Sequence, residues 1–390
     1  PEVLSQLPAH FRADYIDRAG YFADVRSSKA QRRLEKCAAH LFDLVDRFRG
    51  DQAVSKMHSY KLMARLFSEQ CEIVTGEDGP VALKKPADVP AVSLQNPSDP
   101  DASYGHKGKG YKASLTETCV KDNAFQVITD VAVGGANQPD SKDIVPVLER
   151  LEENGAKPGE LFADAGYGSG DNFLDAKASG VDLTAPMTSG SKADENRVRV
   201  EDFTFDDDWA CVLSCLKNHE PTKSGLTEDG KFVFAVFDQS QCEKCDFKNR
   251  CQVKHNKNGK FHFKVLRKTV AAADRRCEQE TPDFKERYKI RSGIEATISE
   301  ANRLTGIKRS WTRGRKRVSS SVIFKAMAIN IKRYVAFQAE KARKAAARLL
   351  FWLKPASYCA KSVHNFSKPA TRQFRCLRIF NFPEKLPLAA

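Results

Sequence analysis

The stretch ELFADAGYGSGDNFLDAKASGVDLTAPM, residues 160–187, holds two short apolar runs separated by a glycine-rich loop and a helical segment. Each run has the length of a short buried strand, and residues 171–180 have the composition of a short helix that ends at a glycine. Asp164 follows the first run directly. It is either a structural residue, with Asp164 or Asp171 capping the next helix, or a carboxylate that faces a ligand crevice at the end of a strand.

The segment upstream of this stretch has a period of two. YKASLTETCV (111–120) and AFQVITDVAV (124–133) alternate like strands, and a Lys-Asp-Asn turn between them predicts an antiparallel hairpin. Residues 139–155 then have helical spacing and end at Gly155. The resulting order, β-β-α-β-α-β, predicts an α/β fold with a mixed sheet flanked by helices.

The rest of the chain differs in character from this core. Residues 28–70 have the spacing of amphipathic helices, and Ala91–Leu94 is short and apolar enough to be a first strand. We divide the chain into a helical N-terminal region that could bind DNA (1–75), a linker (76–90), the first part of a catalytic core (91–189), a cysteine-rich insertion subdomain (190–280), the completion of the core with a basic segment (281–340), and a basic C-terminal tail (341–390).

The charge of the chain indicates the class of its partner. Lys and Arg total 64 against 50 Asp and Glu, a net charge of +14, and the sequence pI is about 9.2. Such an excess favours a polyanion, nucleic acid first and an acidic membrane surface second. No apolar run approaches the roughly 18 residues of a membrane span, and no secretory signal is visible, so we expect a cytoplasmic protein without a membrane partner.

Carboxylates occur at three places that could act together. Asp99 and Asp101 lie in SLQNPSDPDASYG, where Asp-Pro-Asp is also an ordinary turn sequence. Asp164 is the second place and Glu295 the third, with Arg291 one helical turn before it. Carboxylates from separate elements suit phosphodiester cleavage by two divalent ions, because the substrate phosphate completes the metal shell. Arg291 would suit a phosphate contact as a bidentate donor, although it could also form only a surface pair with Glu295.

Three motifs resemble one protein family. DPDASYGHKGKGYK, ADAGYGSGDN and YKIRSGIEATISEANRLTG are similar to the DDE transposases of bacterial insertion sequences, over residues 90 to 335 apart from the cysteine-rich stretch. The resemblance implies an RNase H-like catalytic core with an insertion domain between the second Asp and the Glu. By this resemblance, Asp164 corresponds to the family's second catalytic Asp. Tyr288, Arg291 and Glu295 correspond to the Tyr, Arg and Glu of the helix that bears the family's catalytic glutamate. A lysine of that helix is replaced by Asn302, with Arg303 beside it.

The sequence does not decide which residue is the first acid of the set. Asp101 is our preferred choice, Asp99 is the alternative, and Glu117 in SLTETC is a further candidate outside the motif. The resemblance implies that Asp101, Asp164 and Glu295 bind two Mg²⁺ (or Mn²⁺) ions.

The resemblance also implies what the protein acts on. It implies cleavage at insertion-sequence ends and strand transfer into target DNA, with a homodimer on double-stranded DNA that carries terminal inverted repeats, in the nucleoid of a bacterial cell. The alternatives are a catalytically inactive or truncated protein that binds transposon ends, and a nuclease with the same core but no strand transfer.

A basic segment follows the glutamate helix and predicts a DNA surface. NRLTGIKRSWTRGRKRV is densely basic around an aromatic residue, which suits phosphate contacts and base stacking. The candidate DNA contacts are Tyr288, Arg291, Arg303, Lys308, Arg309, Trp311, Arg313, Arg315 and Lys316.

Five of the 11 cysteines lie between residues 211 and 251. In a reducing cytoplasm such cysteines are thiols or metal ligands rather than disulfides. Our preferred set for a structural Zn²⁺ site is Cys215, Cys242, Cys245 and Cys251. An iron–sulfur cluster and unliganded thiols are the alternatives.

Overall fold

The computed structural model describes residues 7–16, 30–74, 80–106, 108–120, 122–187, 197–256 and 259–359, without the side chains of Arg12 and of 351–359. The chain divides into two compact units, residues 1–333 and 334–390. Each is considered by itself.

The N-terminal part is helical, as predicted. Its elements are α2 (Ala9–Phe11), η1 (Arg12–Ile16), α4 (Ala30–Arg47), α5 (His58–Gln70), β1 (Cys71–Ile73), β2 (Val81–Leu83) and η3 (Pro86–Asp88). Val45, Phe48, Val54 and Tyr60 form a small core between α4 and α5. The first strand expected at 91–94 is wrong: these residues form turns, with the Ser93 amide donating to Pro90 O and the Leu94 amide to Glu69.

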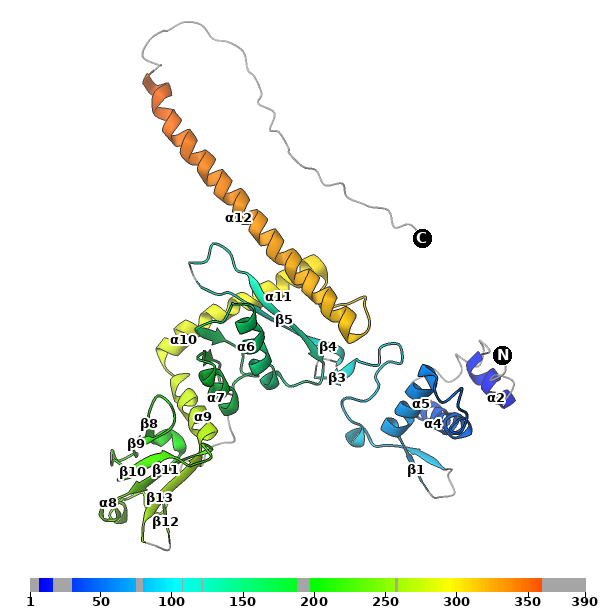
Figure 1. Cartoon of the computed structure of the whole chain (residues 1–390), viewed down its shortest axis with the longest axis horizontal. Coiled ribbons are helices and arrows are strands. Elements are labelled where there is room, and N and C mark those ends of the chain that lie inside the picture. Colours follow the sequence, from blue (N-terminus) through cyan, green and yellow to red (C-terminus); the bar gives the residue numbers. More distant parts are fainter. Residues whose placement is uncertain are drawn as a thin grey trace. The chain divides into compact units, whose positions relative to one another are not determined.

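The predicted hairpin is confirmed. β4 (Gly108–Glu117) pairs with β5 (Ile128–Gly135), and β3 (Ser103–Gly105) adds a third antiparallel strand on the other edge of β4 (Figure 1). The ladder shifts register between Thr116 and Glu117. Such a bulge bends the strand and re-aims the side chain at that point.

The quoted stretch also folds as predicted. After η4 (Asp140–Lys142) and α6 (Ile144–Glu153), β6 (Glu160–Phe162) runs parallel to β7 (Asp182–Thr184), and α7 (Gly170–Ala178) connects them. The expected cap at Asp171 is wrong, because Ser169 is the N-cap residue and accepts a hydrogen bond from the Asn172 amide. Asp171 instead forms an ion pair with Lys268.

The expected single mixed sheet is not observed, although the fold is mixed α/β. Among the described residues β4 pairs only with β3 and β5, and β6 pairs only with β7. A large cavity is lined by both β4 and β6, so side chains and open space lie where a ladder would otherwise join the two sheets.

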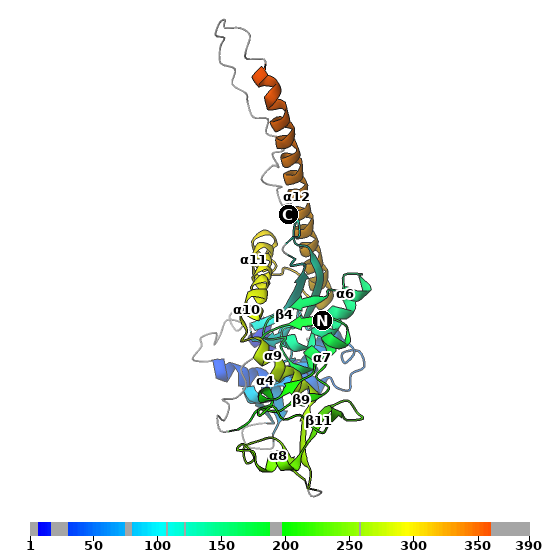
Figure 2. The same ribbon diagram turned by 90° about the vertical axis from the view of Figure 1, so that its left-hand side faces the viewer.

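The segment after β7 forms a further antiparallel sheet. It consists of η5 (Val200–Asp202), β8 (Thr204–Phe205), β9 (Val212–Ser214), β10 (Lys223–Leu226), β11 (Phe232–Phe237), α8 (Gln239–Glu243), β12 (Lys254–His255), β13 (Phe261–Leu266) and α9 (Arg267–Glu278). Its main sheet has the order β10-β11-β13-β12. One continuous core joins this sheet to α6 and α7, through Phe173, Val233, Phe263 and Val270. Helices α7 and α9 lie side by side (Figures 1 and 2).

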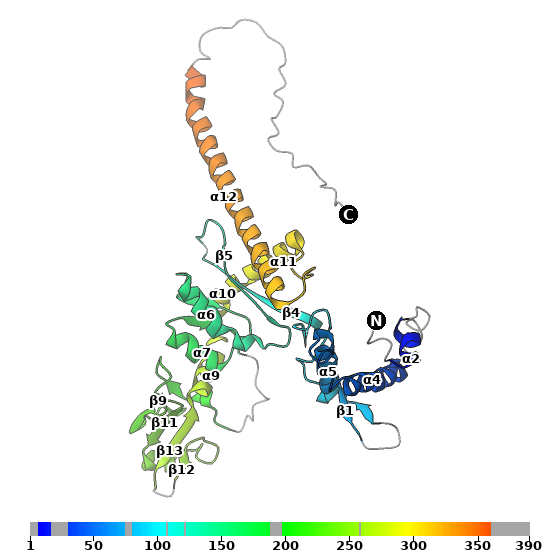
Figure 3. The same ribbon diagram turned by 45° about the vertical axis from the view of Figure 1, so that its right-hand side comes forward.

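Three α-helices complete the described part of the chain: α10 (Pro282–Tyr288), α11 (Ser292–Thr305) and α12 (Arg315–Cys359). A short 3-10 turn, η6 (Lys289–Arg291), lies between α10 and α11. In the first unit, α11 and the start of α12 lie beside β4 and β5 (Figure 3), where Ile128, Ala301, Ala326 and Ile329 share a buried core. Within the described residues no helix is both long and apolar enough to span a membrane.

Candidate active site

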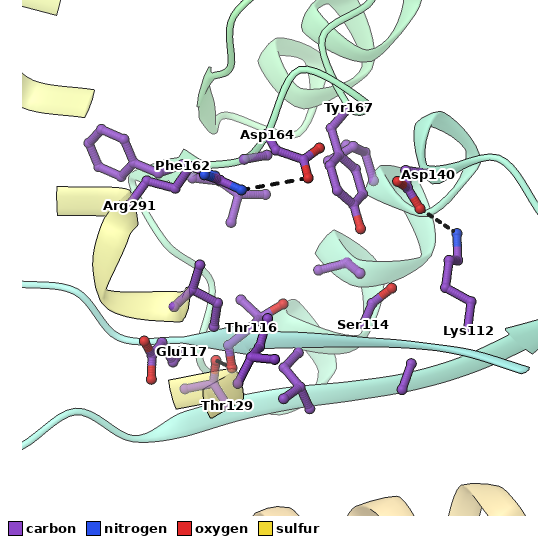
Figure 4. Close-up of a pocket in the computed structure, with 18 of the residues that line it drawn as sticks. Lys112, Ser114, Thr116, Glu117, Thr129, Asp140, Phe162, Asp164, Tyr167 and Arg291 are labelled. Carbon is purple, nitrogen blue, oxygen red and sulfur yellow. Dashed lines mark hydrogen bonds and ion pairs between the residues drawn. The ribbon is translucent and has the colours of Figure 1, made fainter. Parts of the chain in front are cut away.

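A cavity of about 2020 Å³ lies between β4 on one side and the loop after β6 on the other (Figure 4). Helices α10 and α11 supply a third wall. Its lining residues carry charges of both signs, and they include Lys112, Glu117, Asp140, Asp164, Arg291 and Lys308. Carboxylates flanked by basic side chains are what a site for a metal-assisted reaction on a phosphodiester requires.

Asp164 reaches this cavity because of the turn in which it lies. Ala163 still bonds to Thr184 O as part of the β6–β7 pairing, and the chain turns at the next residue. The Asp164 carboxylate accepts a hydrogen bond of 2.9 Å from the Gly166 amide, and its carbonyl accepts one from the Tyr167 amide. Its side chain therefore points from the carboxyl end of β6 into the cavity, as the sequence indicated.

Two of the glycines after Asp164 lie close to other groups. A Cβ on Gly168 would lie 2.1 Å from the carbonyl oxygen of Pro186, so no side chain fits there. A Cβ on Gly166 would lie 3.0 Å from Asp164 Oδ1 and 3.1 Å from Asp140 Oδ2. The two carboxylates therefore lie near one another, on either side of a bare stretch of backbone.

Tyr288, Arg291 and Glu295 come together around Asp164 as a connected set. The Tyr288 hydroxyl donates to the carbonyl oxygen of Ala163 at 3.0 Å and so holds the residue before Asp164. Arg291 lies between two carboxylates, with Nη2 3.6 Å from Asp164 Oδ2 and Nη1 3.0 Å from Glu295 Oε1. In this arrangement the guanidinium group stands between the two predicted metal ligands.

Asp99 and Asp101 lie elsewhere, at the start of α12. Asp99 Oδ1 accepts hydrogen bonds from the Tyr111 hydroxyl and from the Gly314 amide at 3.0 Å, and Asp101 Oδ2 accepts one from the Arg315 amide at 3.1 Å. Neither residue lines the cavity of Asp164. Both carboxylates satisfy amide groups that the first turn of a helix leaves without partners. Burial and the Asp99 carboxylate raise the pKa of Tyr111.

Glu117 lines the same cavity as Asp164, on the opposite wall. It is the last residue of β4, directly after the register shift, and a Cβ on Gly293 at the start of α11 would lie 3.9 Å from its Oε1. Its Oε2 accepts from Thr297 Oγ1 at 2.6 Å and from Arg333 Nη1 at 3.1 Å. The sequence contains one signal for this residue, an acid in SLTETC, where its neighbours are Ser, Leu, Thr and Cys.

Asp140 is a residue of the cavity that the sequence analysis did not single out. Its Oδ1 lies 2.9 Å from Lys112 Nζ, which also lies 2.7 Å from Asp143 Oδ2 (Figure 4). Burial alone would lower the pKa of Lys112, but its bonds to Asp143 and Asp140 leave that pKa raised. Burial raises the pKa of Tyr167, whose ring lies between the Asp140 and Asp164 side chains in Figure 4. Both groups therefore stay protonated at neutral pH.

The donor chemistry of the cavity suits Mg²⁺ or Mn²⁺, since carboxylate oxygens are the ligands that these hard ions prefer. In the described part of the chain, no three His, Cys, Asp or Glu side chains are arranged to hold a metal. Asp164 and Glu295 are not arranged to hold a metal because each of their carboxylates forms an ion pair with Arg291, which lies between them. Metal binding by these two residues would require Arg291 to move.

The basic segment predicted to contact DNA comprises the last turn of α11, the loop between α11 and α12, and the first turn of α12. Lys308 lines the cavity, and Trp311 is 98% exposed. Arg303, Arg309, Arg313, Arg315 and Lys316 are exposed on the same segment. Tyr288 and Arg291, in contrast, are engaged with the Asp164 loop.

The cysteines of the preferred Zn²⁺ set are all thiols in this structure. Burial and the nearby thiols of Cys215, Cys251 and Cys245 raise the pKa of Cys242 to about 11. The four side chains are therefore neighbours, but among the described residues they are not placed as a metal site. The structural Zn²⁺ stays a prediction.

Comparison with known proteins bears on these residues. Residues 214–335 match the family model of a transposase DDE domain. The resemblance to DDE transposases is confirmed. The matched segment holds Tyr288, Arg291 and Glu295, whereas Asp164 and Glu117 of the cavity lie before it. No curated protein and no solved structure matches the chain.

Proposed function

We propose that this protein is a metal-dependent DNA transposase that cleaves DNA at insertion-sequence ends and transfers the strand into target DNA. The observation that carries this proposal is the convergence of Asp164 and Glu117 in one cavity, linked through Arg291 to Glu295 in the segment that matches a transposase DDE domain. The core would be RNase H-like, which agrees with the order β-β-α-β-α-β but would need β4 and β6 to approach one another.

The metal-binding set of the proposed reaction would be Asp164, Glu295 and one further acid. Glu117 is the better candidate for that acid, because it lines the cavity of Asp164, whereas Asp101, our preference from the sequence, and Asp99 bond to amides at the start of α12. When bound, two Mg²⁺ or Mn²⁺ ions would activate the attacking oxygen and stabilise the leaving oxygen of the phosphodiester.

The chain's own residues would have distinct roles in this reaction. Tyr288 would hold the Asp164 loop through Ala163 O. Arg291 would exchange its carboxylate partners for a phosphate oxygen as DNA enters, since a guanidinium group binds either one in the same bidentate way. Lys308, at the edge of the cavity, would contact the DNA backbone.

The partners would be double-stranded DNA with terminal inverted repeats, target DNA and a second copy of the chain. Two ends must be joined in one reaction, so a homodimer on DNA is expected. The alternative, a catalytically inactive or truncated protein that binds ends, is not favoured by the match to a DDE domain.

Cleavage and joining assays with Mg²⁺, on DNA that carries the element's own ends, would test the proposal. We expect Asp164→Asn to lower cleavage by at least about 100-fold, because the removed charge acts directly on the metal ions. Asp171→Asn is the matched control, since Asp171 is an exposed carboxylate seven residues away that pairs with Lys268. Retained cleavage in Asp164→Asn would contradict the assignment, and cleavage without joining would indicate a nuclease.

A further inference from the structure

Helix α12 has two apolar faces, of which the first unit uses one. Val318, Val322, Ala326 and Ile329 are buried at its start, against β4 and β5 and the end of α11. The residues of a second apolar stripe take no part in these contacts: Phe324 is 68% exposed, Ile331 60%, Val335 59% and Leu349 65%. An amphipathic helix of a single folded chain needs only the first of these faces.

The exposed stripe has a regular heptad spacing. Along α12, exposed residues recur at intervals of four and three over 26 residues, and seven of the eight are apolar: Phe324, Ala328, Ile331, Val335, Gln338, Ala342, Ala345 and Leu349. We call this set the α12 seam. A 4-3 repeat is the pattern of a two-stranded coiled coil, whose partner must be another helix with the same repeat.

We infer that the α12 seam pairs with the same seam of a second copy of this chain, as a parallel two-stranded coiled coil. At 1.5 Å per residue the seam is about 38 Å long, which suits a helix of equal length as its partner. The regular 4-3 repeat over 26 residues is what pairing with another helix requires, whereas a helix that lies on a membrane surface needs no such repeat.

The residues beside the seam are compatible with a parallel pair. In a parallel pair, the residue directly before Ala328, Val335 or Ala342 faces the residue five places later in the other copy. Met327 would face Lys332, Tyr334 would face Ala339, and Lys341 would face Ala346. None of these contacts brings two positive charges together, although α12 is strongly basic.

Gln338 is the polar member of the seam. In the parallel arrangement it would lie opposite Gln338 of the second copy, where the two amide groups hydrogen-bond. A polar pair in such a seam lowers stability but fixes the register and the number of strands. This inference names the surface of the dimer, and it does not depend on the chemistry proposed for the cavity.

The test is the mass of the full chain in solution, measured without DNA or metal by sedimentation velocity. We expect a dimer at micromolar concentration. The double variant Ile331→Glu/Val335→Glu should raise the dimer dissociation constant at least about 100-fold, because it places four charges in the seam. Ala347→Glu serves as the control, since it also adds a glutamate to α12, at an exposed position on the side opposite the seam.

Each further outcome has a defined meaning. Because the seam residues are exposed in the single chain, circular dichroism should show an unchanged fold in all variants. Gln338→Leu should tighten the dimer. With air oxygen and a copper catalyst as the oxidant, Gln338→Cys should yield a disulfide between the two copies. A monomeric wild type, or a double variant as dimeric as Ala347→Glu, would overturn the proposal. A dimer in which Gln338→Cys forms no cross-link would overturn the parallel arrangement. Asp164→Asn should remain a dimer, which separates this result from a failure of the proposed activity.

Discussion

At the scale of single residues, position in the fold distinguishes carboxylates that look equivalent in the sequence. Asp101 precedes the hairpin and Glu117 belongs to it, but only Glu117 lines the cavity of Asp164. The carboxylate of Asp101 satisfies the Arg315 amide instead. We therefore expect a chemical role for Glu117 and a structural role for Asp101.

Exchange of these two carboxylates for amides should separate the roles. Glu117→Gln should lower Mg²⁺-dependent DNA cleavage at least about 100-fold, through loss of a metal ligand. Asp101→Asn should keep most of the activity, because its amide oxygen still accepts from Arg315. Thermal unfolding of both variants shows whether the fold is kept. Loss of cleavage in a well-folded Asp101→Asn, with activity retained in Glu117→Gln, would restore Asp101 as the first acid.

The glycines of the Asp164 loop make a second prediction at this scale. Gly168→Ala should destabilise the protein by about 1–3 kcal/mol, because its Cβ would collide with Pro186 O and the neighbouring backbone must shift. Gly159→Ala is the control, since no atom lies within 4 Å of a Cβ there. Chemical denaturation measures both. Equal stability of the two variants would show that the loop adjusts without cost.

At the scale of elements, the long helix α12 depends on a distant segment for its start. Gly314 and Arg315 donate their amides to Asp99 and Asp101, more than 200 residues earlier in the chain. These bonds tie the Asp-Pro-Asp turn to the helix. They also explain why the turn carries two acids, since negative charge at a helix N-terminus is stabilising.

Removal of these caps should therefore weaken the helix start. Asp99→Ala should destabilise the protein by about 1–3 kcal/mol, because Asp99 is buried and the Tyr111 hydroxyl and Gly314 amide would both lose their acceptor. Asp101→Ala, at an exposed position, should cost about 0.5–1 kcal/mol. Urea unfolding checks this order, and a larger loss in Asp101→Ala would contradict it.

At the scale of the whole molecule, the net charge of +14 should govern DNA affinity. The exposed basic segment between α11 and α12 continues from the cavity edge at Lys308. Phosphate contacts release counterions, so binding should weaken steeply with salt. The dependence on salt therefore reports how many of these side chains reach the DNA backbone.

Replacement of basic residues in this segment should flatten the salt dependence. Alanine at Lys308, Arg309 and Arg313 should lower the slope of log affinity against log salt by about 3 in total, if each contacts one phosphate. Alanine at Lys157 and Lys285 should leave the slope unchanged, since each already pairs with a glutamate. Fluorescence anisotropy with end-containing DNA measures both slopes. Equal slopes for the two variants would place the DNA on another surface.

The sequence by itself determined the order of the elements from β4 to β7, the hairpin, the parallel strand–helix–strand unit and the position of Asp164 after β6. These features follow from local patterns, since periods of two and 3.6 residues and glycine punctuation act over short stretches. Tertiary structure alone decided that Glu117 lies across the cavity from Asp164, that Asp140 lies beside it, and that Asp99 and Asp101 cap α12. Those outcomes depend on which distant segments pack together, and a carboxylate in a turn carries no local mark of the amide or the cavity that it will face.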